Sequence, residues 1–132
     1  MKAPTIEGLM RRDPVTITPL DTLAAAQSLM QRVGVRQLPV VEKGELIGIL
    51  SERDMRAHSG YLERTKVDAA MSERLITVSP KDSAARAARL LLDQKINAVP
   101  VVEDGRLVGI VSRSDLLHLL VEIVDAQQGK GS

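Results

Sequence analysis

Leu38–Asp54 reads LPVVEKGELIGILSERD, and Val99–Asp115 reads VPVVEDGRLVGIVSRSD. The same offset of 61 residues aligns residues 10–56 with residues 71–117 without a gap and gives 17 identities in 47 positions. Self-similarity at a constant spacing is typical of a repeated structural unit. The sequence therefore predicts two copies of one unit, and these two stretches are its best-defined part.

Each of these stretches contains two apolar runs around a short turn. Lys43-Gly44 forms the turn in the first copy, and Asp104-Gly105 forms it in the second. A dipeptide such as Asp-Gly between apolar runs is a strong signal for a β-hairpin. The expected strands are Leu38–Val41 with Leu46–Leu50, and Val99–Val102 with Leu107–Val111.

A short strand and a helix are expected before each hairpin. The β-prone runs 15–17 and 76–78 end at Thr18-Pro19-Leu20-Asp21 and Ser79-Pro80-Lys81-Asp82, which both match a capping box with Pro at the first helical position. Apolar residues then recur at helical spacing. Gly34 is expected to end the first helix, where the second copy has Lys95. The periodic residues are Leu23, Ala26, Met30 and Val33 in the first copy and Ala84, Ala87 and Leu91 in the second.

A further helix is expected after each hairpin, beginning at Ser51-Glu52-Arg53-Asp54 or Ser112-Arg113-Ser114-Asp115. Each copy is thus a predicted β-α-β-β-α unit of the α+β (α/β) class. A unit of about 50 residues buries too little surface by itself, so the two copies are expected to share a core. We expect the first repeat at residues 5–58, the second at residues 66–125, and a flexible tail at residues 126–132.

Composition argues against several classes of protein. A hydrophobic content of 44% and a charged content of 27% argue against both disorder and a membrane protein, and the evenly mixed charges argue against a nucleic acid partner. The chain has no Cys and no apolar leader, which fits the cytoplasm. His58 and His118 are isolated, so no metal site is expected. Tyr61 is the single aromatic residue, so any base-binding surface is aliphatic, and Arg11-Arg12 is interpreted as a solvated helix end.

The duplicated unit resembles the CBS repeat. The resemblance rests on Leu-Pro-Val-Val and Val-Pro-Val-Val, on the stretches 48–54 and 109–115, and on Met10 and Met71 before the first strands. It implies two repeats packed about a pseudo-two-fold axis, a Bateman module. It also implies two clefts between the halves that bind AMP, ADP, ATP or a related adenosyl ligand.

The resemblance also assigns roles to individual residues. Asp54 and Asp115 would accept hydrogen bonds from ribose hydroxyls, assisted by Ser51 and Ser112. Because the second copy has Asn97 where the first has Arg36, the two clefts are not expected to be equivalent. The adenine slots would be formed by Thr16, Ile17, Leu38 and Pro39 and by Thr77, Val78, Asn97, Ala98, Val99 and Pro100. The phosphate-binding candidates are Arg36, Arg53 and Arg113.

Each of these residues also has a purely structural interpretation. Ser-x-x-Asp before an apolar run is an ordinary helix cap, and a duplication copies a cap as faithfully as a ligand site. The two roles are compatible, because a helix N-terminus has free N–H groups and the positive end of the helix dipole. Arg36 is alternatively a solvated charge that discourages strand pairing.

The function that follows is a non-enzymatic regulatory module with an adenine nucleotide as its regulatory ligand and no required cofactor. No nucleophile with a matching base is recognisable, so an enzyme is not expected. The alternative function is a structural module that serves dimerisation without a physiological nucleotide. A homodimer is expected through the helices 54–58 and 115–125, and an unidentified target protein is a further expected partner. The apolar stripe assigned to the second helix is Leu116, Leu119, Leu120 and Ile123.

Overall fold

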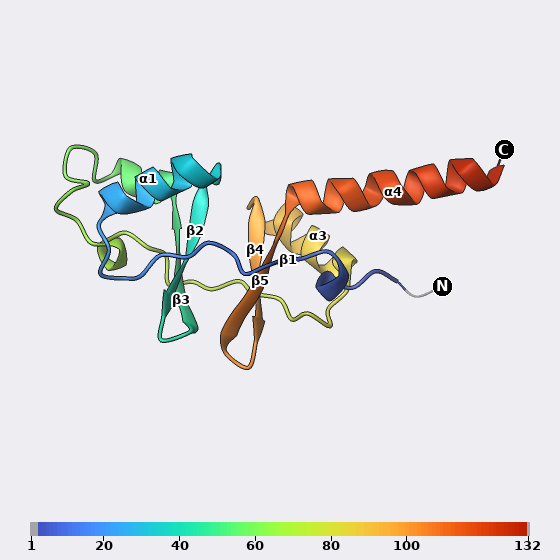
Figure 1. The fold of residues 1–132 in the computed structure, drawn as a ribbon, viewed down its shortest axis with the longest axis horizontal. Coiled ribbons are helices and arrows are strands. Elements are labelled where there is room, and N and C mark those ends of the chain that lie inside the picture. The colour runs from blue at the N-terminus through green and yellow to red at the C-terminus, as the bar shows by residue number, and fades with distance from the viewer. Residues whose placement is uncertain (1–2, 132) are drawn as a thin grey trace. The chain divides into compact units, whose positions relative to one another are not determined.

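The computed structural model describes residues 3–131 of the chain and has a mixed α/β fold (Figure 1). Both predicted β-hairpins are present. This confirms the predicted fold class. In chain order the elements are the 3-10 helix η1 (Ile6–Gly8), β1 (Arg11–Arg12), α1 (Leu23–Val33), β2 (Gln37–Glu42), β3 (Glu45–Ser51), α2 (Glu52–Arg56), the 3-10 helix η2 (Val67–Ala69), α3 (Ala84–Gln94), β4 (Ala98–Glu103), β5 (Arg106–Ser112) and α4 (Arg113–Gly131).

The chain divides into two compact units. The first-repeat unit consists of Pro14–Ile76 with Asp104–Leu107, and so contains α1, β2, β3 and α2. The second-repeat unit consists of the chain up to Asp13, Thr77–Glu103 and the chain from Val108 onward. Each unit therefore includes the segment that precedes the other repeat in the sequence: the N-terminal segment belongs to the second-repeat unit, and the connector belongs to the first.

These two segments satisfy backbone groups near the start of a helix. In the second-repeat unit, Ile6 N donates to Asp82 O at 2.9 Å, and Ala84 N at the start of α3 donates to Pro4 O at 2.9 Å. The first N–H groups of a helix have no partner inside the helix, so such bonds stabilise its start. The equivalent bonds in the first-repeat unit join Val67 N to Asp21 O at 2.8 Å and Leu23 N to Thr65 O at 2.9 Å.

The predicted helix starts at Thr18 and Ser79 are wrong. α1 begins at Leu23, and its N-cap Thr22 accepts a bond from Ala25 N. The Asp21 carboxylate does reach back to Thr18 N at 3.0 Å, but this contact closes a turn before the helix. The Asp21 carbonyl accepts its bond from the connector, which keeps this residue outside the helix. In the second copy, the Asp82 carboxylate accepts from Ser79 N, and α3 begins at Ala84 after the N-cap Ser83.

Both predicted hairpin turns are confirmed. Lys43 and Gly44 have φ values of 54° and 82°, and Asp104 and Gly105 have φ values of 53° and 79°. Two successive residues with positive φ are the geometry of a type I′ turn, which matches the twist of the two strands. β2 pairs with β3 in antiparallel register, with a shift between Val40 and Val41.

The predicted short strands before the helices are reduced to single parallel bridges. Ile17 bridges Val40, and Val78 bridges Val101. Ile17 N donates to the carbonyl of Pro39 at 3.1 Å. Since a proline has no N–H to return a bond, the ladder stops after one bridge on this side of β2.

Two glycines let the N-terminal segment and the connector lie directly against the hairpins; we call these two the exchanged segments, because each precedes one repeat and belongs to the unit of the other. A Cβ at Gly48 would lie 2.6 Å from the Met71 sulfur, and one at Gly109 would lie 2.8 Å from the Met10 sulfur. Real Cβ atoms essentially never show such short contacts. Glycine therefore allows the close approach, and each methionine packs over the glycine of its own unit.

α4 differs from the helix predicted at residues 115–125. It begins at Arg113 and continues to Gly131, because Ala126, Gln127 and Gln128 are good helix formers. Leu116 and Leu119 of the predicted stripe are half-buried. Leu120 and Ile123 are exposed, together with Leu117, Val121 and Val124. Exposed apolar side chains are therefore spread more widely around α4 than a single stripe. In residues 3–131, no helix is both long enough and apolar enough to cross a membrane.

Candidate ligand-binding sites

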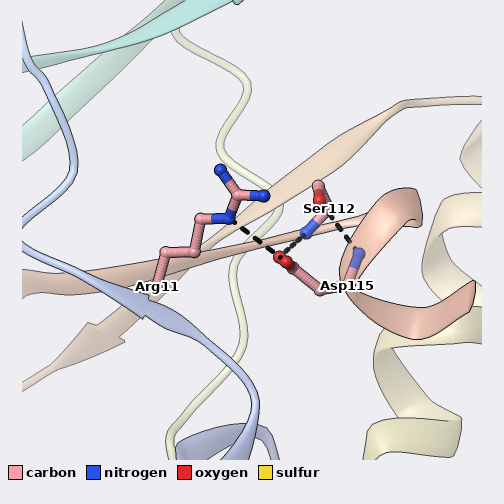
Figure 2. A network of polar contacts seen from close by, with 3 residues as sticks. All are labelled: Arg11, Ser112 and Asp115. Carbon is pink, nitrogen blue, oxygen red and sulfur yellow. Dashed lines mark hydrogen bonds and ion pairs between the residues drawn. The ribbon is translucent and has the colours of Figure 1, made fainter. Parts of the chain in front are cut away.

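A Ser-x-x-Asp turn ends each hairpin and begins the next helix. In the first-repeat unit, Ser51 N donates to Asp54 Oδ2 at 2.9 Å, and Asp54 N donates back to Ser51 Oγ at 3.2 Å. In the second, Ser112 N donates to Asp115 Oδ2 at 2.8 Å, and Asp115 N donates to Ser112 Oγ at 3.2 Å (Figure 2). The predicted caps are thus formed in both copies. Each cap uses Oδ2 of the aspartate and fixes the orientation of the carboxylate.

The remaining oxygen, Oδ1, distinguishes the two aspartates. Asp115 Oδ1 receives a hydrogen bond from Arg11 Nε at 3.2 Å (Figure 2). Within residues 3–131, the Asp54 carboxylate receives hydrogen bonds only from Ser51. Arg11 lies in β1 beside Ile110 of β5, so its interpretation as a solvated helix end is wrong. No local pattern predicts this contact, since 104 residues separate the two partners.

The structure brings the predicted residues of the first site together along the backbone. Glu52 N donates to Arg36 O at 3.0 Å, which places the Ser-x-x-Asp turn beside the start of β2. The bridge between Ile17 and β2 then places Thr16 on the other side of the same strand. The second-repeat unit repeats this arrangement, with Arg113 N donating to Asn97 O at 3.0 Å and Val78 N donating to Pro100 O at 3.1 Å.

The predicted adenine-slot residues differ in accessibility. Thr16 and Asn97 are exposed, and Thr77 and Ala98 are half-buried, so a ligand can reach these four side chains. The remaining six residues belong to the core: Ile17, Leu38, Pro39, Val78, Val99 and Pro100. Leu38 and Val99 have no exposed surface at all. Because they are buried, these six residues do not form an accessible wall.

The three predicted phosphate-binding arginines are also not equivalent. Arg113 donates from Nε to Ile96 O at 3.1 Å and from Nη2 to Leu91 O at 3.3 Å. These carbonyls lie at the C-terminal end of α3, where a cation is favoured by the helix dipole. Arg36 and Arg53 are exposed, and their guanidinium groups donate to no other residue in the described part of the chain. Of the three candidates, Arg36 and Arg53 are therefore the two whose donors are uncommitted.

A pocket of about 260 Å³ lies in the first-repeat unit between α1 and α2, where Met30, Met55 and Arg56 are among the lining residues. None of the predicted site residues lines it. No group of three or more His, Asp or Glu side chains in residues 3–131 could hold a metal ion.

Comparison with known proteins identifies the repeated unit. The model of the CBS domain family matches residues 6–60 and 67–122. The CBS domain-containing protein YhcV of Bacillus subtilis is 34% identical over 115 residues, which cover 85% of this chain and 82% of YhcV.

Two crystal structures show the same fold over nearly the whole chain. AcuB from Vibrio cholerae is 30% identical, has a TM-score of 0.87, and is matched over 97% of this chain and 98% of its own. CBSX2 in complex with AMP is 27% identical, with a TM-score of 0.83 over 91% of this chain and 98% of its own. The chain therefore belongs to the CBS domain family and carries two CBS domains in tandem.

Proposed function

We propose that this protein is a non-enzymatic regulatory module that binds an adenine nucleotide, or a related adenosyl ligand, beside each Ser-x-x-Asp turn. The observation that carries the proposal is the geometry of Asp54. Its Oδ2 is fixed by the cap, whereas its Oδ1 has no partner among the described residues. A carboxylate held in this way is prepared to accept a ribose hydroxyl without losing its cap.

Each part of the ligand has a candidate partner in the first-repeat unit. Ser51 and Asp54 bind the ribose, and Thr16 contacts the adenine above the buried floor of Ile17, Leu38 and Pro39. Arg36 and Arg53 donate to phosphate, because guanidinium groups with free donors make strong charge-assisted hydrogen bonds to phosphate oxygens.

The corresponding residues of the second-repeat unit form a site whose arginines, Arg11 and Arg113, already have partners. Ser112 and Asp115 bind the ribose, and the adenine lies against Thr77, Asn97 and Ala98 over Val78, Val99 and Pro100. Arg113 already uses two of its five N–H donors on the carbonyls at the end of α3, so fewer remain for a phosphate. We therefore propose that the more highly phosphorylated ligand, ATP or ADP, prefers the first site.

The bound AMP of CBSX2 supports the choice of ligand class, since that protein shares the fold over most of its length. The proposal assigns no catalytic residue, no required cofactor and no metal. We place the module in the cytoplasm, where adenine nucleotides are available, and assign it an unidentified target protein.

A second candidate function is a structural module that serves dimerisation. It is favoured by exposed apolar side chains of α4, namely Leu117, Leu120, Val121 and Val124. Contiguous exposed apolar side chains on a helix commonly mark an interaction surface. In this second function no nucleotide is the physiological ligand, so nucleotide titration separates it from the first.

Calorimetric titration with AMP tests the nucleotide proposal. Asp54→Asn keeps the shape of the side chain but replaces one carboxylate oxygen with a donor. Hydrogen bonds to a charged acceptor contribute about 1.5–3 kcal/mol each, so affinity at the first site should fall about tenfold or more. Asp115→Asn should do the same at the second site.

Each aspartate also belongs to a helix cap, so the control must show that a loss of affinity is not caused by unfolding. Circular dichroism and thermal unfolding should show that both variants remain folded, since the amide oxygen of Asn can still accept the hydrogen bond from the Ser51 or Ser112 N–H. A folded Asp54→Asn, Asp115→Asn double variant that binds AMP like the wild type would show that the aspartates are only caps.

A further inference from the structure

We infer that Arg11 is a latch on the second site: it holds the Asp115 oxygen that the ribose requires and so makes this site weaker than the first. This inference rests on the proposed function of Asp115 as the ribose acceptor. Arg11 belongs to the N-terminal segment and not to the Ser-x-x-Asp turn, and it controls access to the Asp115 carboxylate.

Both oxygens of Asp115 are engaged. Ser112 N occupies Oδ2 at 2.8 Å, and Arg11 Nε occupies Oδ1 at 3.2 Å (Figure 2). The Asp115 side chain is only 10% exposed. Each carboxylate oxygen can accept two hydrogen bonds, so the guanidinium competes with a ribose hydroxyl for the little surface of Asp115 that is exposed.

The first-repeat unit has the same backbone arrangement without the latch. At the offset of 61 residues, the residue equivalent to Arg11 is Ser72. Ser72 exchanges backbone bonds with Ile49 of β3, as Arg11 pairs with Ile110 of β5. The Ser72 hydroxyl accepts a hydrogen bond from Arg74 N at 3.3 Å, and among the described residues it makes no hydrogen bond with Asp54. The duplication therefore provides a natural comparison in which one side chain differs at the same position.

The latch is weak enough to open. The Arg11 side chain is 67% exposed, and exposed ion pairs contribute little because water competes for both partners. A ligand that binds here must break this ion pair, and that cost should make ribose affinity about two- to fivefold lower than without Arg11. Salt screens such a pair, so the latch should weaken as ionic strength rises.

Adenosine is the most informative probe because it carries the ribose and the base but no charge. In the Asp54→Asn background, calorimetry reports binding at the second site. Arg11→Ser should raise adenosine affinity there by about two- to fivefold. With Arg11 present, raising NaCl from about 0.05 M to about 0.5 M should also raise adenosine affinity, and Arg11→Ser should remove most of this salt dependence.

The reciprocal exchange tests the latch at the other site. In the Asp115→Asn background, Ser72→Arg should lower adenosine affinity at the first site by a similar factor. The matched control is Arg12→Ser, which removes one positive charge from the neighbouring exposed position of β1. Arg12 makes no ion pair with another described residue, so this control should leave adenosine affinity unchanged.

The outcomes separate the latch from the proposed function. Unchanged adenosine affinity in folded Arg11→Ser, with binding intact, overturns the latch alone. If Arg11→Ser instead lowers AMP affinity and leaves adenosine unaffected, Arg11 is a phosphate ligand and the latch is also wrong. If neither the wild type nor any variant binds adenosine or AMP, the proposed function and the latch both fail.

Discussion

Lys95 is one of the described non-glycine residues with a positive φ. It ends α3 with φ 55° and ψ 44°, in the left-handed region, where the equivalent residue of α1 is Gly34 with φ 78°. A residue with a Cβ is less stable than glycine in this conformation, by about 1 kcal/mol. The duplication therefore shows the same helix end once with a favourable residue and once with an unfavourable one.

Lys95→Gly should raise the free energy of unfolding by about 0.5–1 kcal/mol. Relief of the left-handed strain exceeds the greater entropy that glycine gives the unfolded chain. Urea denaturation monitored by circular dichroism measures the change. The reciprocal variant Gly34→Lys should lower the free energy of unfolding by a similar amount, because a Cβ at Gly34 meets no atom within 4 Å and strain is the main effect. A destabilised Lys95→Gly variant would contradict this account.

At the scale of elements, the contact between each exchanged segment and its hairpin depends on one glycine. At Gly109, a Cβ would lie 2.8 Å from the Met10 sulfur and 2.9 Å from the backbone oxygen of Arg11. At Gly48, the nearest backbone oxygen is that of Ser72, at 3.1 Å. A methionine side chain can move aside, whereas the backbone of a paired segment cannot move without breaking its bonds.

Gly109→Ala should therefore destabilise the protein by about 1–3 kcal/mol, and more than Gly48→Ala does. Thermal and urea unfolding measure both variants. Gly8→Ala is the control, because Gly8 lies in the N-terminal segment and a Cβ there meets nothing within 4 Å. If Gly109→Ala is as stable as Gly8→Ala, the N-terminal segment does not pack on β5 as described.

At the scale of the whole molecule, the exposed apolar side chains of α4 predict a homodimer. Leu117, Leu120 and Val121 are 53–62% exposed, which is unfavourable for a helix that remains in water. Light scattering should give twice the chain mass of 14.3 kDa. The double variant Leu117→Glu, Val121→Glu should be monomeric, because a dimer would have to bury unpaired carboxylates.

Leu92→Glu is the matched control for the dimer. Leu92 is 65% exposed but lies on α3, so this variant should keep the mass of the wild type. A wild-type protein that remains monomeric at micromolar concentration, with or without AMP, would contradict the prediction.

The sequence by itself determined the features that depend on neighbouring residues. The Lys43-Gly44 and Asp104-Gly105 turns and the Ser51 and Ser112 caps form as predicted, because each is closed by groups at most three residues apart. The left-handed end of α1 at Gly34 belongs to the same class. Local chemistry is sufficient for such features, and the duplication made the turns and the caps visible twice.

The tertiary structure alone decided which distant segments supply the remaining partners. The carbonyls of Asp21 and Asp82, just before α1 and α3, accept hydrogen bonds from the connector and the N-terminal segment, although the caps at Thr22 and Ser83 that start these helices are local. Arg11 meets Asp115 because β1 lies beside β5, and Arg113 turns to the end of α3. Such contacts join residues far apart in the sequence, so they depend on how the whole chain folds. It leaves no pattern among neighbouring residues, so the two aspartates could be found from the sequence, whereas the difference between them could not.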